Sequence, residues 1–130
     1  MGGMSTSLRI ANVVFDCGNA EALAGFWSAA LDRPIDPDPT EFFASIGVKD
    51  DATPSLFFAK VPEAKTAKNR CHVDLHAESR EAVAEELARL EALGAKVIRD
   101  PKEEFGVYWA TLQDPEGNEF CVERSAAERA

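Results

Sequence analysis

The sequence predicts an α+β fold made of two copies of one strand-helix-strand-strand-strand module. Three observations support this prediction. Residues 10–31 and 70–95 share one plan when they are shifted by 60 positions, each begins with a strand-like alternation of apolar and polar residues, and each continues with an N-cap and a helical apolar stripe. The length of 130 residues and the 45% hydrophobic content suit one domain with one core, so each copy is a half-domain.

The first module begins with a strand over residues 10–17, in which Val13 and Phe15 point to one side and Asn12, Val14 and Asp16 to the other. Asn19 is the expected N-cap of a helix through about Leu31. The proline-rich residues 33–40 cannot be helical and form an irregular edge strand or a loop. Two apolar runs, 42–48 and 55–61, predict strands joined by a polar hairpin loop, which gives about three strands after the helix.

The second module repeats this order. Residues 72–76 alternate, with His72, Asp74 and His76 on the face away from the expected helix. Ser79 is the expected N-cap and Gly94 the left-handed residue that ends the helix. Three strands follow, over residues 95–99, 107–113 and 119–123, and a strong turn signal over residues 114–118 separates the last two.

The predicted boundaries follow from this pattern. The domain spans residues 8–123, with module one at 8–62, a connector at 63–70 and module two at 71–123. Residues 1–7 and 124–130 are expected to be a flexible start and a flexible tail.

Charge and composition exclude several functions. The net charge is -9 and the basic residues do not cluster, so we expect neither nucleic acid nor an anionic membrane as a partner. No apolar run approaches a membrane span and no signal pattern is present, which predicts a cytoplasmic protein. Three irregularly spaced cysteines indicate reduced thiols buried on strands rather than disulfides.

Four segments resemble the vicinal oxygen chelate superfamily, which includes glyoxalase I, extradiol dioxygenases and bleomycin-resistance proteins. They are AGFWSAAL, KNRCHVDLHA, ALGAKVIRD and DPEGNEFCVE, and the resemblance, which is closest to the small glyoxalase-like branch, extends from about Leu8 to Glu123. It implies paired βαβββ modules whose mixed sheets curl around a central cavity, with helices outside, and often a homodimer. The same scaffold holds metal enzymes and metal-free binders.

In the metal-dependent members, the first and last strands of each module supply the metal ligands. Matching residue by residue puts Asn12 first, Ala59 or its neighbour Phe58 second, His72 third and Cys121 fourth. Only His72 is an ordinary match, because Asn is a feeble ligand and Cys121 replaces the carboxylate expected as proton-transfer base. We therefore expect no cofactor and no ordinary glyoxalase I site. A Zn, Ni, Mn or Fe ion is the alternative, with His72 and Cys121 as weak candidate ligands.

The expected ligand-binding side chains are Asn12, Asp16, His72, Asp74, Trp109 and Cys121. Tyr108 and Trp109 face opposite sides of one strand, so just one of them can line the cavity. His72 and His76 are too far apart along a strand to share an ion. Phe residues at 42, 43, 57 and 58 would make the first module's cavity wall apolar wherever they point inward.

These observations leave three functions open. The leading hypothesis is a bleomycin-resistance-type protein that binds a small aromatic or cationic molecule without metal. The alternative is a lyase, isomerase or dioxygenase that uses His72 with Asp74 or Glu119 as acid or base, although Glu119 is equally explained as an exposed strand-end carboxylate. The third is a dimerisation module whose cavity is merely packed.

Overall fold

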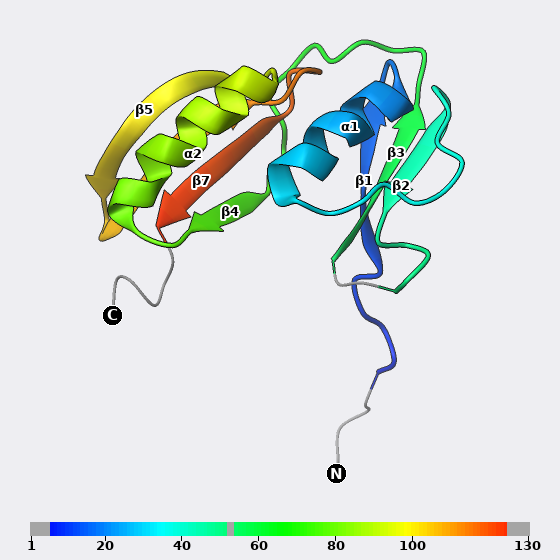
Figure 1. Ribbon diagram of the computed structural model, residues 1–130, viewed down its shortest axis with the longest axis horizontal. Helices are drawn as coiled ribbons and strands as arrows, with labels where there is room; N and C mark the ends of the chain where they lie inside the picture. Colours follow the sequence, from blue (N-terminus) through cyan, green and yellow to red (C-terminus); the bar gives the residue numbers. More distant parts are fainter. Residues whose placement is uncertain (1–5, 52–53, 125–130) are drawn as a thin grey trace. The chain divides into compact units, whose positions relative to one another are not determined.

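The computed structural model describes residues 6–51 and 54–124 and confirms the α+β class (Figure 1). Its backbone falls into two compact units, with Val61 at the end of the first and Pro62 at the start of the second; the short segment Ala29–Leu31 groups with the second. The described residues hold two helices and seven strands in two mixed sheets. The expected flexible start and tail lie largely outside the described residues.

The first unit contains β1 (Asn12–Cys17), α1 (Ala20–Leu31), β2 (Phe43–Ile46) and β3 (Ser55–Lys60). Its sheet has the order β1-β3-β2, with β1 parallel to β3 and β2 antiparallel to it. The Phe15 ring stacks on Phe58 at 5.4 Å between ring centroids and lies 5.3 Å from the ring of Trp27 of α1. Trp27 and Phe58 are completely buried, so the aromatic core lies on the helix-covered face of this sheet.

The expectation of about three strands after α1 is wrong for the described part of the first unit, which has two. The segment between α1 and β2 is irregular, although Asp36 N donates to Ser45 O at 2.8 Å and so follows the edge of β2 for a short distance. Pro34, Pro37 and Pro39 lack the N–H groups that a longer ladder needs. The prolines therefore end the pairing before a further strand forms.

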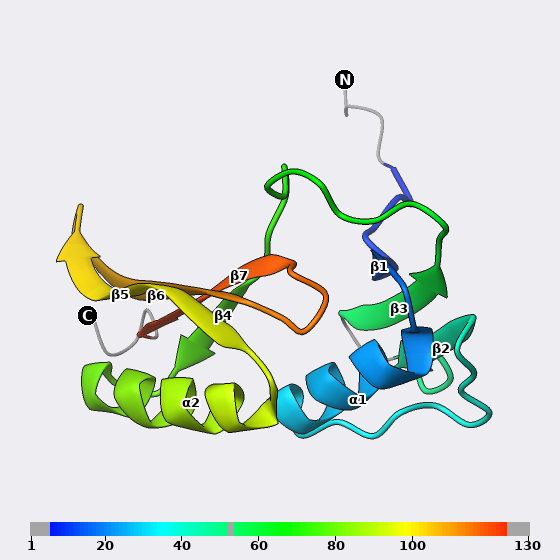
Figure 2. The ribbon, with the colours of Figure 1, turned by 90° about the horizontal axis from the view of Figure 1, so that it is seen from above.

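The second unit contains β4 (Asp74–Ala77), α2 (Arg80–Leu93), β5 (Lys96–Glu104), β6 (Val107–Gln113) and β7 (Glu119–Arg124). Its sheet order is β4-β7-β6-β5, with β4 parallel to β7 and the other neighbours antiparallel. Figure 2 shows α2 along one face of this sheet. Apolar side chains fill the interior of this unit, namely Val83, Leu87, Leu90, Ala110, Leu112, Phe120 and Val122.

The capping residues fall where the sequence predicts them. Asn19 accepts from Ala22 N, and Ser79 accepts from Ala82 N, so each side chain satisfies a donor in the first turn of its helix. Gly94 ends α2 with φ at 118°, a conformation that only glycine adopts without strain. Both helices therefore begin where the alternating strand ends.

The prediction for the cysteines is partly wrong. Cys17 and Cys121 are buried on strands, but Cys71 is exposed. It lies in the irregular stretch before β4, where no helix covers it. Within the described residues, no helix combines the length and the hydropathy required to cross a membrane.

Candidate functional site

The face of the second sheet opposite α2, which we call the open face, carries a row of polar residues. The register aligns Asp74 of β4 with Cys121 of β7, Cys121 with Thr111 of β6, and Thr111 with Arg99 of β5. Side chains alternate along each strand, so the buried neighbours Phe120, Ala110 and Leu112 point toward the helix and the row points away from it. One carboxylate, one thiol, one hydroxyl and one guanidinium therefore follow each other across four strands.

His72 joins this row at the β4 end. Its Nε2 lies 3.1 Å from Asp74 Oδ1, and ligand atoms of His72, Asp74 and Cys121 all lie within 4.8 Å of one another. His72 and Asp74 are half exposed, with 48% and 50% of their side chains accessible, whereas Cys121 is buried. The structure thus brings together three of the residues that the sequence singles out.

Cys121 is held as a neutral thiol. Burial is the largest effect and raises its pKa, and the hydrogen bond with the Thr111 hydroxyl at 3.5 Å lowers it in part. The negative charges of Asp74 and Glu123 raise the pKa further, and Arg99 opposes them, so the pKa stays above its ordinary value. A thiol with a raised pKa is a weak nucleophile at neutral pH. The prediction of a reduced thiol buried on a strand is confirmed for Cys121.

A second histidine-carboxylate pair follows along the same strands. His76 Nε2 lies 2.8 Å from Glu123 Oε1, and the Glu123 side chain is 17% exposed. His72 and His76 therefore pair with different carboxylates, in agreement with the prediction that they are too far apart to share an ion.

Trp109 is the aromatic residue on the open face, two positions before Thr111 on β6. The Arg99 guanidinium lies 3.9 Å above the centre of its ring. Tyr108 points to the other side of the strand and is covered by Arg80 at 4.1 Å. One of the two aromatic side chains faces the site, as expected from their adjacent positions.

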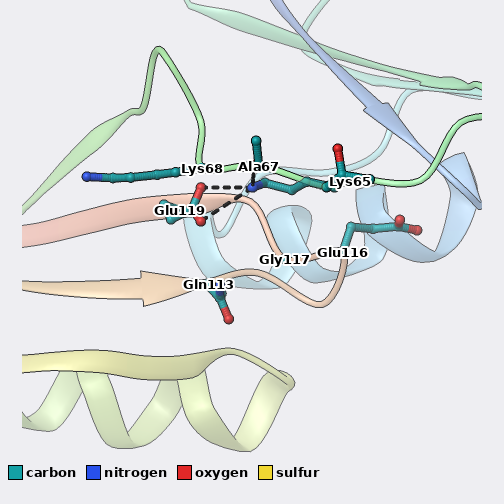
Figure 3. A pocket seen from close by; sticks show the side chains of 8 residues that line it. Lys65, Ala67, Lys68, Gln113, Glu116, Gly117 and Glu119 are labelled. Atoms are coloured by element: carbon teal, nitrogen blue, oxygen red, sulfur yellow. Dashed lines mark hydrogen bonds and ion pairs between the residues drawn. The ribbon is translucent and has the colours of Figure 1, made fainter.

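Glu119 is not an exposed strand-end carboxylate. It is 9% exposed, and its Oε1 accepts from Asn69 N at 2.9 Å and lies 3.2 Å from Lys65 Nζ (Figure 3). Asn69 Nδ2 also donates to Glu119 O at 3.2 Å. Burial opposes ionisation of Glu119, but the Asn69 N–H and the Lys65 ammonium outweigh it and hold its pKa below the usual value. Glu119 thus ties the connector to β7 as an ionised, already paired carboxylate.

The connector and the β6–β7 turn also line an open pocket of about 290 Å³. Figure 3 shows Lys65 reaching across it toward Glu119, and the Lys65 ammonium also donates to Ala67 O. The Lys65 ammonium is therefore engaged by Glu119 and by the Ala67 carbonyl, both within the same unit. We assign this pocket to the anchoring of the connector rather than to a ligand.

Asn12 and Asp16 lie on the face of the first sheet opposite α1, with Val14 between them. They belong to the first unit, whereas His72, Asp74, Trp109 and Cys121 belong to the second. That all six residues form one site remains a prediction.

The sequence reasoning missed Arg99 and Thr111 of the polar row, and it missed Lys65 and Asn69, which anchor Glu119. Thr111 could have been found by counting two positions on from Trp109 along the strand. Arg99 could not, because β5 contains register shifts on both sides of it. A register shift such as those beside Arg99 produces no periodic pattern of residues in the sequence, and neither does the contact between the connector and Glu119.

The donors present fit a divalent metal in chemical type but not in the arrangement that the superfamily implies. His, Asp and Cys all bind zinc, and the ligand atoms of the three groups lie within 4.8 Å of one another, whereas a tetrahedral ion holds its ligand atoms about 3.5 Å apart. In the first sheet, Phe57 pairs with Val14 as Cys121 pairs with Asp74, so Phe57 occupies the equivalent of Cys121. Phe57, Phe58 and Ala59 have no ligating side-chain atom. Any ion would be held by the second unit's His72, Asp74 and Cys121.

The fold, the repeated module and the strand positions of these residues define a protein of the vicinal oxygen chelate class. The family model of the glyoxalase-like domain matches residues 12–123, and the chain belongs to this family.

Solved structures agree in fold. A glyoxalase/bleomycin resistance protein/dioxygenase family enzyme from Burkholderia phytofirmans PsJN is 18% identical with a TM-score of 0.76, over 90% of this chain and 98% of its own. A possible glyoxalase from Bacillus cereus is 22% identical with a TM-score of 0.70, over 90% and 99%. Lactoylglutathione lyase from Agrobacterium tumefaciens is 15% identical with a TM-score of 0.65, over 94% and 96%. These identities show a shared fold and do not transfer an activity. No curated protein sequence matches the chain.

Proposed function

We propose that this glyoxalase-like protein binds a small molecule on the open face of its second sheet, in the manner of a bleomycin-resistance-type binder, and holds no resident metal. The observation that carries the proposal is the polar row from Asp74 to Arg99 beside Trp109. A few convergent polar groups next to an aromatic ring are typical of small-molecule sites.

The existing contact between His72 and Asp74 and the protonated state of Cys121 favour a site without a metal ion. The nearest partner of His72 is Asp74, and the Cys121 thiol has a raised pKa, so a metal would have to displace a proton and compete with an existing pair. The first sheet supplies an aromatic or small apolar residue where a further ligand would stand. The described residues supply three donors, two of them half exposed, so any ion there would keep a coordination position open to solvent.

Metal analysis of protein purified without chelator tests this form. We expect far less than one equivalent of Zn, Ni, Mn or Fe per chain, and no change in the His72→Ala variant. One tightly held ion per chain that disappears in His72→Ala would overturn the metal-free proposal. His76→Ala is the matched control, because His76 pairs with Glu123 and is outside the three-donor cluster.

The second candidate is an enzyme, a lyase, isomerase or dioxygenase, and the His72–Asp74 contact of 3.1 Å favours it specifically. Asp74 would orient the imidazole through Nε2, and His72 would take or return a proton at Nδ1. A divalent ion held by His72, Asp74 and Cys121 would polarise a substrate oxygen. Glu119 is less suited to proton transfer, since its carboxylate is occupied by Lys65 and Asn69.

A ligand screen separates the two candidates. Thermal-shift measurements with and without metals identify stabilising compounds, and each of these is then tested for turnover. Turnover that falls at least tenfold in Asp74→Asn, with binding retained, would establish the enzyme. Binding without turnover supports the binder.

Two expectations complete the proposal: a homodimer, which the family resemblance implies, and a cytoplasmic location, which the hydropathy pattern of the sequence favours. Sedimentation velocity of the full chain measures the first directly, with a single species of twice the 14.1 kDa chain mass expected. A monomer at micromolar concentration would contradict it. Fluorescence microscopy of the tagged chain in its own cell checks the second.

A further inference from the structure

Arg99 is the cationic end of the polar row, and it is fixed in place by its own strand neighbours. Its guanidinium stacks on Trp109 at 3.9 Å, and Nη1 donates to Trp109 O at 3.2 Å. The side chain is 25% exposed. Holding a guanidinium in one orientation removes entropy that a ligand would otherwise have to remove on binding.

Arg99 has more donors than its partners in the described structure use. A guanidinium carries five N–H groups, and Arg99 donates to Trp109 O and lies beside the Glu104 carboxylate. Nη2 is buried without a hydrogen-bond acceptor, although Glu104 Oε1 lies 3.4 Å away as an ion-pair partner. Glu104 is closer to Lys102, whose Nζ lies 2.9 Å from the same oxygen. The Glu104 carboxylate is therefore shared between Arg99 and Lys102, and it neutralises the charge of Arg99 only in part.

Thr111 adds a second donor beside Arg99. The two residues are partners across β5 and β6, and the single side-chain contact of the Thr111 hydroxyl in the described structure is the Cys121 thiol at 3.5 Å. A hydroxyl can donate to a ligand while its oxygen still accepts from the thiol. The guanidinium and the hydroxyl together form a short donor edge on the open face.

The same geometry disfavours a ligand cation at Trp109. The ring face that would attract a cation is already covered by Arg99, so an incoming ammonium would meet a like charge instead of a free π-face. The overall charge of -9 opposes anions, but at physiological salt it is screened beyond about 8 Å, whereas the guanidinium would act at contact distance.

From these observations we propose that the ligand carries a carboxylate, which Arg99 and Thr111 bind, and that its remaining part extends along the row toward His72 and Asp74. The proposal rests on the binding function above and names its ligand class. A carboxylate has two acceptor oxygens, which can accept from a remaining guanidinium N–H group and from the Thr111 hydroxyl. Asp74 at the far end of the row repels a second anion and so orients the molecule. Glu123, the cross-strand partner of Trp109, is engaged by His76 at 2.8 Å.

Three probes with one aromatic body and different charge test the proposal: 2-naphthoate, 2-naphthamide and 2-naphthylmethylammonium. Dissociation constants are measured by ¹⁵N heteronuclear NMR titration of the full chain, following the backbone signals of residues 109, 111 and 121. We expect the carboxylate to bind at least about tenfold more tightly than the other two. Arg99→Gln should lower carboxylate affinity to that of the amide.

Lys102→Gln is the matched control, because it removes the same charge from the same strand at a side chain that is 59% exposed and not stacked on Trp109. It should retain the carboxylate preference. Arg99→Lys keeps the charge but loses the planar guanidinium, so its affinity for the carboxylate should lie between those of the wild type and of Arg99→Gln. This variant also tests the proposal if Arg99→Gln does not fold. A smaller loss, about threefold to tenfold, is expected in Thr111→Val.

The outcomes separate the two proposals. Equal binding of all three probes at these residues, preference for the ammonium, or equal losses in Arg99→Gln and Lys102→Gln would overturn the carboxylate class and leave the binding function standing. If none of the probes shifts these signals at millimolar concentration, the carboxylate class and the proposed site both fail.

Discussion

Replacement of Glu119 by Gln tests whether this residue is an anchor or a catalytic carboxylate. The substitution preserves size and one carbonyl oxygen, so the bond from Asn69 N at 2.9 Å can be kept. It removes the charge that faces Lys65 Nζ at 3.2 Å. Because the Glu119 side chain is 10% exposed, water cannot replace the lost partner fully.

The expected loss is intermediate between a surface pair and a buried one. A hydrogen bond to a charged group contributes about 1.5–3 kcal/mol, and an exposed pair less than about 1 kcal/mol. Lys65 is 23% exposed and can turn toward water, which limits the loss to about 1–3 kcal/mol. For a chain of 130 residues this corresponds to a Tm lower by roughly 3–12 °C.

The effect depends on pH with a definite sign. The pKa of Glu119 is lowered in the folded protein, because the Asn69 N–H and Lys65 outweigh the opposing effect of burial. A depressed folded-state pKa contributes stability above the unfolded value, close to 4.5, and loses it as the pH falls through the folded value. The difference between wild type and Glu119→Gln should therefore be full at pH 7 and shrink below about pH 4.

Urea denaturation followed by circular dichroism measures the difference at each pH. A double-mutant cycle with Lys65→Met isolates the pair, and we expect a coupling of at least about 0.5 kcal/mol. Additive effects of the two substitutions, or a Glu119→Gln variant with unchanged stability, would refute the anchoring role. Loss of turnover at unchanged stability would instead restore Glu119 as a catalytic candidate.

Two further predictions concern groups outside this anchor. Asp36→Asn should cost about 1.5–3 kcal/mol in urea denaturation at pH 7, because Asp36 Oδ2 accepts from Ser45 Oγ at 2.6 Å and from two backbone N–H groups. The pKa of Asp36 is lowered by these bonds despite burial, so the loss should vanish as the pH falls through the folded-state value; an unchanged loss at pH 2 would contradict this. Titration with a disulfide reagent at pH 7.5 should modify Cys71 rapidly, and Cys17 and Cys121 only after unfolding in urea. Two or more fast thiols would show that a strand cysteine is accessible.

Local chemistry made the secondary structure predictable. Asn19, Ser79 and Gly94 each satisfy a helix end by a contact or a conformation that depends on near neighbours in the chain, and sequence position alone identifies them. Alternation likewise assigned Asn12, His72 and Asp74 to the faces away from the helices. These signals depend on residues close together in the sequence, so they can be recognised without knowledge of the tertiary structure.

Contacts between distant segments were not predictable in the same way. Glu119 meets Asn69 across 50 positions, and the sequence reasoning placed it equally well at an exposed strand end. Arg99 reaches Trp109 because β5 shifts register on both sides of it. Such partners depend on where the backbone bends, which residue spacing does not encode.

The two modules differ in chemistry where they agree in topology. In both sheets the first strand is parallel to the last, yet the pair Asp74 and Cys121 is matched in the first unit by Val14 and Phe57. Val14 is 55% exposed, and Phe57 packs against Phe43, which is 59% exposed, so the face of the first sheet opposite α1 carries exposed apolar side chains between the polar Asn12 and Asp16. The duplicated scaffold thus presents a polar row on one copy and an aromatic surface on the other. Charge-dependent selectivity should therefore follow substitutions in the second unit, where the carboxylate, thiol, hydroxyl and guanidinium are arranged, and not the equivalent positions of the first.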